Sequence, residues 1–404
     1  MQSLPDASVA SVSGAGSLSA RLGVLRHRNF ALYWFGMVLS NTGSWMQLTA
    51  EGWLVYQLTD APIWLGAVAG ARAISMIGLP FLGGVVADRM DRRILLFITQ
   101  TSSMALAALL ATLTATGLVQ VWHILAIAAL GGVAFAFDQP TRQALVPALV
   151  PRAELRKAIA LNAVVYTGGA FIGPAAAGGL APLIGVAGVF AINAGSFLAI
   201  IGALALMRLP GQATRPPRTS QSVWASSLEG LRFVRQHELI LVVIGLSAVT
   251  SLLLRFHQQL APVFARDILG ADIRGLGLLM SGPGLGALIG AFAVATWSRL
   301  PPNGRLTGIA VPGLFVAVVV FAASRWFPVS LLSLVAIGLL NTVYSTSVRT
   351  MLQLSSPAEY HGRVMSLNTI TFIGFTPLGG FIGGALAQGL GAPWAVAAGA
   401  LAAG

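Results

Sequence analysis

The sequence contains no cysteine, little charge and a single lysine, and each shortage excludes a class of protein. Without cysteine the chain forms no disulfide and no thiolate metal site. Only 9% of its 404 residues are Asp, Glu, Lys or Arg, and 56% are hydrophobic. Soluble domains carry about 25% charged residues. A soluble chain this apolar would lack the polar surface to cover itself, so we expect lipid around most of it.

Nucleotide-driven and metal-dependent chemistry also lack their signatures. The one lysine, Lys157, lies in Leu-Arg-Lys-Ala, so no Gly-x4-Gly-Lys-Ser/Thr loop occurs. The 5 histidines are scattered, and no His-Glu-x-x-His is present. We therefore predict that the protein is not an enzyme and has no cofactor and no metal site. A net charge of +12 would suggest nucleic acid in a soluble protein, but here the positions of the charges matter more, and we expect no nucleic-acid partner.

Twelve apolar segments are long enough to cross a bilayer, which takes about 20 residues. Backbone groups in lipid must be satisfied within the segment, so each is predicted to be an α-helix. The segments are 29–57, 62–87, 94–117, 121–146, 157–182, 186–208, 238–265, 273–298, 306–325, 328–352, 363–389 and 392 onward. The last would rise only about 20 Å, so we expect that the natural chain continues or that this last helix is truncated.

One long connection divides the helices into six plus six. Residues 209–237 are rich in Pro and Arg and then show an apolar stripe of helical spacing, which predicts a short amphipathic helix at the membrane surface. The predicted organisation is a cytosolic tail at 1–28, a six-helix bundle at 29–208, a cytosolic linker at 209–237 and a second six-helix bundle at 238–404.

The two halves also resemble each other and share one orientation. Shifting residues 132–185 by 206 positions gives ten identities in 54 positions, including Asn162 with Asn368 and Pro151 with Pro357. Such a tandem repeat is typical of transporters built from two parallel halves. With the N-terminus in the cytosol, nineteen of the 24 basic residues fall on the cytosolic side and only three on the outer side. The positive-inside rule thus predicts that both termini are cytosolic.

The loop after the second segment carries a recognisable motif. It reads Gly-Gly-Val-Val-Ala-Asp-Arg-Met-Asp-Arg-Arg over residues 83–93, and it resembles the Gly-x-Leu-Ala-Asp-Arg-x-Gly-Arg-Arg loop of the major facilitator superfamily. The matching residues are Gly84, Ala87, Asp88, Arg89, Arg92 and Arg93. The resemblance implies that this loop latches the cytosolic gate; an ordinary basic loop is the alternative. The aligned loop at 297–302 lacks the Asp, which puts a second latch in doubt.

Further stretches at 25–30, 53–56 and 137–147 resemble the branch of that superfamily that contains the enterobactin exporter and related bacterial efflux proteins. The resemblance implies a multi-pass protein of the bacterial inner membrane that works as a monomer. It also implies alternating access and export of siderophores or drugs, the latter as a means of drug resistance. An importer or uniporter of the same fold remains open.

Helix-bending residues recur in the two halves. Gly173, Pro174 and Gly178 lie in the fifth segment and Pro377 and Gly379 in the eleventh. Proline bends a helix and glycine permits close crossing, so we predict a hinge, with plain packing as the alternative. The fifth segment is similar to the antiporter motif of drug-exporting facilitators, but it has three residues rather than two between Pro174 and the glycine pair.

Ionisable residues at membrane depth are candidates for the transport pathway. The resemblance implies that segments 1, 4, 7 and 10 line the central cavity. The predicted pathway residues are Glu51, Arg72, Asp138, Arg142, Arg255, His257, Asn341 and Tyr344. Structural readings stay open: Asp138 and Arg142 suit an i,i+4 pair, Glu51 could reach outer water, Arg72 could pair with an acid, and a lone histidine such as His257 is often structural.

These residues suggest a mechanism. Asp138 or Glu51 is expected to take a proton from outside and release it inside, and protonation would free Arg255 or Arg142 for the substrate. A catecholate or carboxylate would suit Arg255. An amphipathic or cationic drug would suit the acids and the aromatic residues Trp34, Trp45 and Trp53. The expected partners are therefore a small-molecule substrate, protons and the lipid bilayer.

Overall fold

The computed structural model describes residues 23–78, 86, 90–207, 231–296, 304–357 and 360–403, and throughout these ranges the ordered elements are helices. The elements are η1 (Gly23–Arg26), α2 (Arg28–Thr59), α3 (Pro62–Gly78), α5 (Arg92–Ala115), α6 (Val121–Leu149), η2 (Arg152–Glu154), α7 (Leu155–Leu206), α9 (Glu238–Leu253), α10 (Phe256–Val263), η3 (Phe264–Ile268), α11 (Ile273–Thr296), α12 (Gly304–Ala323), α13 (Phe327–Ser355), α14 (His361–Leu390) and α15 (Ala392–Ala403).

The predicted spans agree with these helices to within a few residues at each described end. Helix α7 covers two spans, since its 52 residues run through a non-helical Gly185, and α9, α10 and η3 together form one. Eight described segments, α7 among them, are long and apolar enough to cross a bilayer. With α2, α3, α15 and the second crossing of α7, the fold has the predicted twelve helices.

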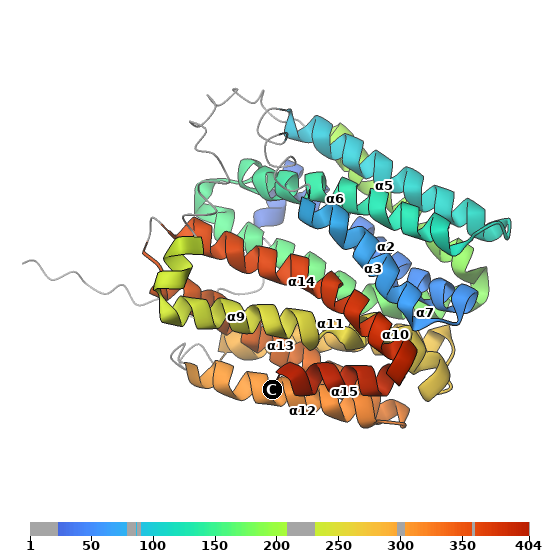
Figure 1. Cartoon of the computed structure of the whole chain (residues 1–404). Coiled ribbons are helices and arrows are strands. Elements are labelled where there is room, and N and C mark those ends of the chain that lie inside the picture. Colours follow the sequence, from blue (N-terminus) through green and yellow to red (C-terminus); the bar gives the residue numbers. More distant parts are fainter. Residues whose placement is uncertain are drawn as a thin grey trace, which may run out of the picture.

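The helices form two bundles (Figure 1). Helices α2, α3, α5, α6 and α7 pack together in the upper half of the view, and α9 to α15 pack together in the lower half. Contact between the halves is concentrated where α7 meets α11 and where α14 meets α3. A cavity between two such bundles is therefore bounded by helices of both.

The repeat predicted from the sequence is present in the backbone. Helices α6 and α13 both have 29 residues and begin 206 positions apart. Gly185 and Gly391, also 206 apart, both have positive φ, at 71° and 83°. Positive φ is accessible to glycine at little cost, so the same turn recurs in both halves. The prediction of two parallel, repeated halves is confirmed.

The repeated glycines also make equivalent contacts. A methyl group on Gly178 of α7 would lie 3.0 Å from the carbonyl oxygen of Ile273 in α11, and one on Gly384 of α14 would lie 2.9 Å from that of Pro62 in α3. Each glycine thus lets backbone of one bundle touch backbone of the other. We call these two contacts the glycine seams.

The other predicted hinge residues lie in tightly packed helix crossings within a bundle. A methyl group on Gly173 would lie 2.8 Å from the carbonyl oxygen of Thr42, and one on Gly379 would overlap the carbonyl of Leu252. Pro174 is buried in α7, and Pro377 lies inside α14. Close packing is thus observed, while the hinge role stays a prediction.

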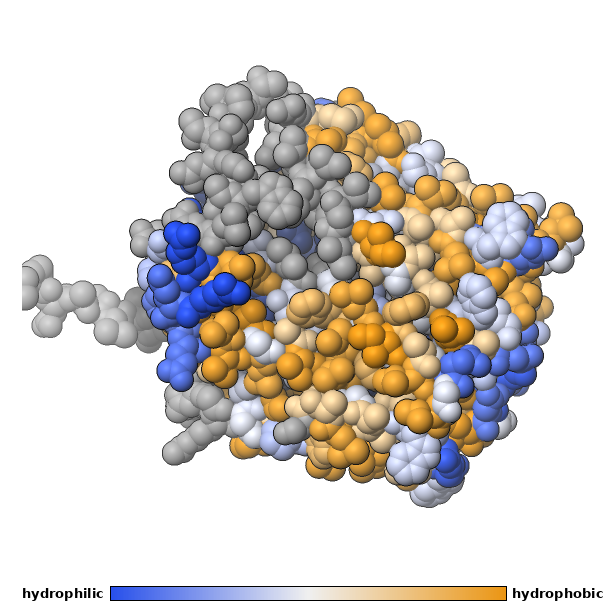
Figure 2. All heavy atoms as spheres, in the orientation of Figure 1, coloured by the Kyte–Doolittle hydropathy of each residue, from blue (hydrophilic) through white to orange (hydrophobic). Residues whose placement is uncertain are grey.

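The outer surface is suited to lipid. Figure 2 shows a broad apolar belt between polar groups at opposite ends of this face. Large apolar side chains of the helices point outward, for example Ile74, with 74% of its surface exposed, and Phe292, with 72%. Trp122, Trp326 and Trp394 are exposed at or beside the starts of α6, α13 and α15, as tryptophans are at membrane interfaces. The protein is a multi-pass membrane protein.

Candidate functional site

A cavity of about 940 Å³ lies between the bundles. Its polar lining comes from α2, α3, α5, α6 and α7 on one side and from α9, α13 and α14 on the other. The charged residues that line it are Glu51, Arg72, Asp138, Arg142, Arg255 and Arg349. Six of the eight predicted pathway residues line the cavity, namely Glu51, Arg72, Asp138, Arg142, Arg255 and Tyr344. Asn341 reaches it through Arg255, and His257 lies elsewhere.

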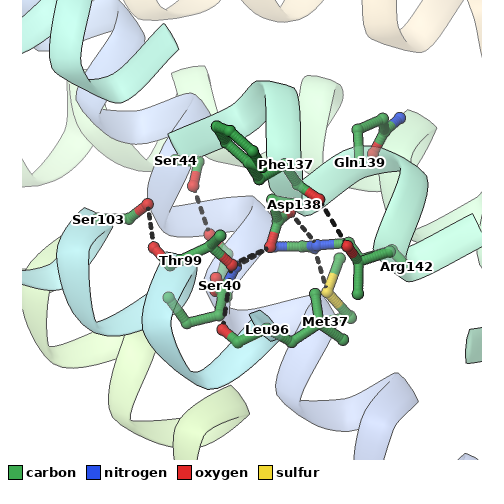
Figure 3. A network of polar contacts seen from close by, with 12 residues as sticks. Met37, Ser40, Ser44, Leu96, Thr99, Ser103, Phe137, Asp138, Gln139 and Arg142 are labelled. Atoms are coloured by element: carbon green, nitrogen blue, oxygen red, sulfur yellow. Dashed lines mark hydrogen bonds and ion pairs between the residues drawn. The ribbon is translucent and has the colours of Figure 1, made fainter. Parts of the chain in front are cut away.

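Asp138 is the centre of a buried polar network on α6 (Figure 3). Its side chain forms an ion pair with Arg142, one turn further along the helix. The opposite carboxylate oxygen accepts hydrogen bonds from the Thr99 hydroxyl at 2.9 Å and the Gln100 amide at 2.6 Å, both on α5. Asp138 has only 6% of its surface exposed. An ion pair and two polar side chains of α5 thus surround the carboxylate.

Arg142 continues the network to α2. It contacts the Met37 sulfur as well as Asp138. The buried Tyr33 hydroxyl and the side-chain oxygen of Gln100 have no hydrogen-bond partner among the described residues. The network therefore ties α2, α5 and α6 together at the cavity wall. The i,i+4 pair of Asp138 and Arg142, one of the readings from the sequence, is part of it.

Glu51 and Arg72 form a second ion pair, between α2 and α3, at 2.7 Å. The Glu51 side chain has 3% of its surface exposed and that of Arg72 has 30%. This pair borders both the large cavity and a smaller one of about 170 Å³, which is also lined by His257. Arg72 thus pairs with an acid, which was one of its two readings from the sequence. The pair lies where the two cavities meet.

Arg255 lies at a break in the seventh span. Helix α9 ends at Leu253, and α10 begins at Phe256. Its guanidinium donates to the Asn341 side-chain oxygen at 2.9 Å and lies 4.3 Å from the centre of the Phe372 ring. Within the described part of the chain it forms no ion pair. A cation that is held by an aromatic ring and a neutral amide, with no acid beside it among the described residues, is suited to binding a negative group.

Tyr344 and His257 play different parts. The Tyr344 hydroxyl lies 3.2 Å from that of Thr250 and donates to Ser247 at 3.3 Å, which joins α13 to α9 at the cavity wall. The His257 ring is buried; Nδ1 bonds the Leu254 carbonyl oxygen, and Nε2 has no partner among the described atoms. His257 is therefore the one predicted pathway residue that lines only the smaller cavity.

Polar contacts link the two bundles at one end of α2. Arg266 forms an ion pair with Asp60 at 2.6 Å, and Asp267 accepts a hydrogen bond from the Tyr56 hydroxyl. The Arg266 guanidinium also lies 5.2 Å from the Tyr56 ring centre. Tyr56 and Asp60 lie at the end of α2, and Arg266 and Asp267 lie in η3. We call these four residues the end latch.

The predicted cytosolic gate motif is described in part. Gly84, Asp88 and Arg89 lie outside the described residues. Arg92 donates to the Ala144 carbonyl oxygen of α6 at 3.0 Å, and Arg93 donates to that of Ala205 in α7 at 2.7 Å. These arginines hold α5 within its own bundle, and their gate role stays a prediction.

Several residues of the site were missed from the sequence. Thr99, Gln100 and Phe372 are uncharged and resemble other helix residues, so only their three-dimensional neighbours reveal them. The end latch was also missed, because Asp60 and Arg266 lie more than 200 positions apart, near the ends of two different spans. Acidic and basic residues at the ends of spans are the sequence signal that could have pointed to it.

Comparison with known proteins agrees with this arrangement. Residues 19–403 match the family of transmembrane secretion effectors. The multidrug efflux pump Tap of Mycolicibacterium fortuitum is 26% identical over 366 residues, which cover 88% of each chain. The enterobactin exporter EntS of Salmonella choleraesuis is 30% identical over 324 residues, covering 78% of this chain and 74% of the exporter.

Solved structures with low sequence identity share the fold. A D323A mutant of the nucleoside transporter NupG superposes with a TM-score of 0.70 at 14% identity, covering 96% of this chain and 98% of the transporter. A bacterial homologue of the lysosomal transporter Spinster, inward-facing and unoccupied, gives a TM-score of 0.69 at 15% identity, with 92% and 83% covered. At these identities the likeness concerns the fold alone.

Proposed function

This chain belongs to the transmembrane secretion effector family of major facilitator transporters, and we propose that it exports small molecules across the bacterial inner membrane in exchange for protons. It is a transporter rather than an enzyme. The observation that carries the proposal is the cavity of about 940 Å³ between two bundles, with buried ion pairs in its wall and an end latch across one end. Pockets for small molecules typically measure about 300–1,000 Å³.

Export is favoured by the relatives. The similar proteins include a multidrug efflux pump and an enterobactin exporter. We therefore infer a substrate that resembles a siderophore or an amphipathic drug. The aromatic side chains of the cavity, such as Trp45, Phe135 and Phe372, suit such molecules.

Alternating access follows from the two kinds of contact between the bundles. With both termini in the cytosol, as the distribution of arginine predicts, the end latch and the glycine seams lie on the outer side. In that orientation the chain is closed to the outside and holds its cavity on the cytosolic side. Opening the outer end requires the bundles to part at Gly178 and Gly384 and the pair of Asp60 and Arg266 to separate.

Glu51 is the better candidate for the coupling acid. Asp138 has donors from three side chains, Arg142, Thr99 and Gln100, each of which would be lost or weakened on protonation. Glu51 has one ion-pair partner, Arg72, which is partly exposed. Because fewer favourable contacts oppose its protonation, Glu51 is expected to exchange the proton, and Arg72 then becomes free to hold an anionic group.

An importer or uniporter of a small organic solute is the alternative. The spacing between Pro174 and the glycine pair, one residue longer than in the antiporter motif, keeps it open. A uniporter would move its solute down a gradient and would need no titrating acid in the cavity.

The test is proton release from energised inverted vesicles that contain the full chain, on addition of siderophores or amphipathic drugs. We expect at least one compound to release protons in the wild type and in the control Glu154→Gln, whose carboxylate lies outside the cavity, but not in Glu51→Gln. Loss in Asp138→Asn alone would transfer the coupling role to Asp138. Solute movement without proton flux would refute antiport and leave the uniporter.

A further inference from the structure

The charges that line the cavity do not balance. Four arginines and two acids face it: Arg72, Arg142, Arg255, Arg349, Glu51 and Asp138. The lining therefore carries an excess of positive charge in a site that is partly withdrawn from water. Such an excess attracts anions, and it does so more strongly where the surroundings are less polar than water.

The two acids are already engaged, which decides against a cationic ligand. Glu51 is paired with Arg72 at 2.7 Å, and Asp138 is paired with Arg142. A cation that approached Asp138 would have to displace Arg142 from a buried pair, which leaves a buried charge without its partner and is costly. A cation that approached Glu51 would have to compete with Arg72 for the same carboxylate. The acids therefore offer little to a cationic drug.

Arg255 is in the opposite situation. Its one hydrogen bond in the described part of the chain goes to Asn341, a neutral amide, and a guanidinium has five N–H donors. One of its faces lies 4.3 Å from the Phe372 ring centre. The amide and the ring orient the cation without neutralising it. Its remaining donors form a fork that fits a carboxylate or a similar planar anion.

The lining of the cavity suits an aromatic partner. The Phe372 ring is 38% exposed and lines the cavity, as do Trp45, Phe135 and Tyr166. Tyr344 lies one turn beyond Asn341 on α13 and faces the same space. An aromatic ring gains more from such a lining than an aliphatic group of the same size does.

We propose that Arg255, held by Asn341 and Phe372, is the anion-binding centre of the cavity and that the transported substrate is an aromatic organic anion. This rests on the proposed function, since it takes the cavity to be the transport site. The proposal favours an anionic over a cationic substrate. An anion can bind Arg255, which forms no ion pair among the described residues, whereas both acids of the cavity, Glu51 and Asp138, are already paired.

The test is direct binding to the purified full chain in lipid nanodiscs, with three probes of one shape and different charge. The probes are 1-naphthylacetate, the neutral 2-(1-naphthyl)ethanol and the cationic 2-(1-naphthyl)ethylamine, followed by calorimetry or by quenching of their fluorescence. We expect the anion to bind at least about tenfold more tightly than the alcohol, as one charge-assisted hydrogen bond provides, and the amine to bind most weakly.

Arg255→Gln should abolish the preference for the anion, and Arg255→Lys should retain part of it. Arg349→Gln is the matched control: it removes the same charge from the lining but leaves the cradle, and it should lower anion affinity about threefold or less. Unchanged thermal unfolding of each variant shows that the fold is kept.

Equal affinities for the three probes, tightest binding of the amine, or equal losses in Arg255→Gln and Arg349→Gln would overturn the proposal. The binding experiment needs no proton gradient. A chain that binds the anion but releases no protons in vesicles would therefore refute antiport and keep the anion site, and the reverse result would refute the site alone.

Discussion

Removing the carboxylate charge of Asp138 should destabilise the protein far more than removing that of Glu51. Asp138→Asn leaves the guanidinium of Arg142 without its counter-charge in a site where the two side chains are only 8% and 12% exposed. It also turns the amide N–H group of the new asparagine toward one of the side chains that donate to the carboxylate of Asp138. Loss of one partner of a buried ion pair costs about 3–5 kcal/mol, and the retained bond from Thr99 places this case near the lower end, at about 3 kcal/mol.

Glu51→Gln should cost about 1 kcal/mol, because the Arg72 side chain is 30% exposed and water can solvate it. The double variant Asp138→Asn with Arg142→Gln removes both charges and should cost about 1 kcal/mol, since two neutral amides can bond to each other. The double-mutant cycle for Asp138 and Arg142 should therefore give an interaction of about 2 kcal/mol or more.

The assay is reversible unfolding of the purified chain in mixed detergent micelles by sodium dodecyl sulfate, followed by circular dichroism. The free energy of unfolding is compared for the wild type, the single variants and the double variant. An interaction below about 0.5 kcal/mol, or a Glu51→Gln cost equal to that of Asp138→Asn, would refute the assignment of Asp138 as the firmly held carboxylate.

Three further predictions concern the parts around the cavity. Gly178→Val should keep the outer end from closing and lower transport at least about tenfold, because the new side chain meets backbone of α11. The control Gly179→Val, with open space around it, should transport normally. Equal activity of the two variants in vesicle transport assays would contradict the role of the glycine seam. Arg266→Gln should favour the outward-open state, measured as increased labelling of a cysteine placed at Ala261, which is buried beside the smaller cavity. Labelling unchanged from that of the same cysteine with Arg266 intact would contradict the latch. Asp91→Ala should cost about 1 kcal/mol of stability by removing the N-cap of α5, while Asp91→Asn keeps the cap and should cost less; equal losses on unfolding would show that the cap is not used.

The fold was largely predictable, because the bilayer imposes strict rules. Apolar length fixed the twelve spans, and the 206-residue repeat anticipated that α13 would reproduce α6. The break of the seventh span at Arg255 was not predicted. Nothing in the local pattern marks it, since Leu254 and Phe256 are ordinary helix residues and the conformation depends on α13 and α14 packed beside it.

The candidate site was predictable in its charged members except Arg349, and only in part in its pairing. Charge in an apolar helix is visible in any sequence, so Glu51, Asp138 and Arg255 stood out. Whether a charge is neutralised depends on a second helix, as the ion pair of Glu51 with Arg72 shows. The lack of such a partner at Arg255 could only be read from three-dimensional neighbours.

The two bundles are joined at the end latch and the glycine seams by two kinds of contact, which respond differently to pH and salt. The glycine seams are contacts of uncharged backbone, which neither pH nor salt alters. The pair of Asp60 and Arg266 is exposed, at 70% and 39% of its side chains, and its attraction is screened over about 8 Å at physiological ionic strength. The salt concentration outside the protein can thus change how strongly the end latch holds the two bundles together. Higher salt would weaken the ion pair of Asp60 and Arg266 and leave the close packing of the glycine seams unchanged.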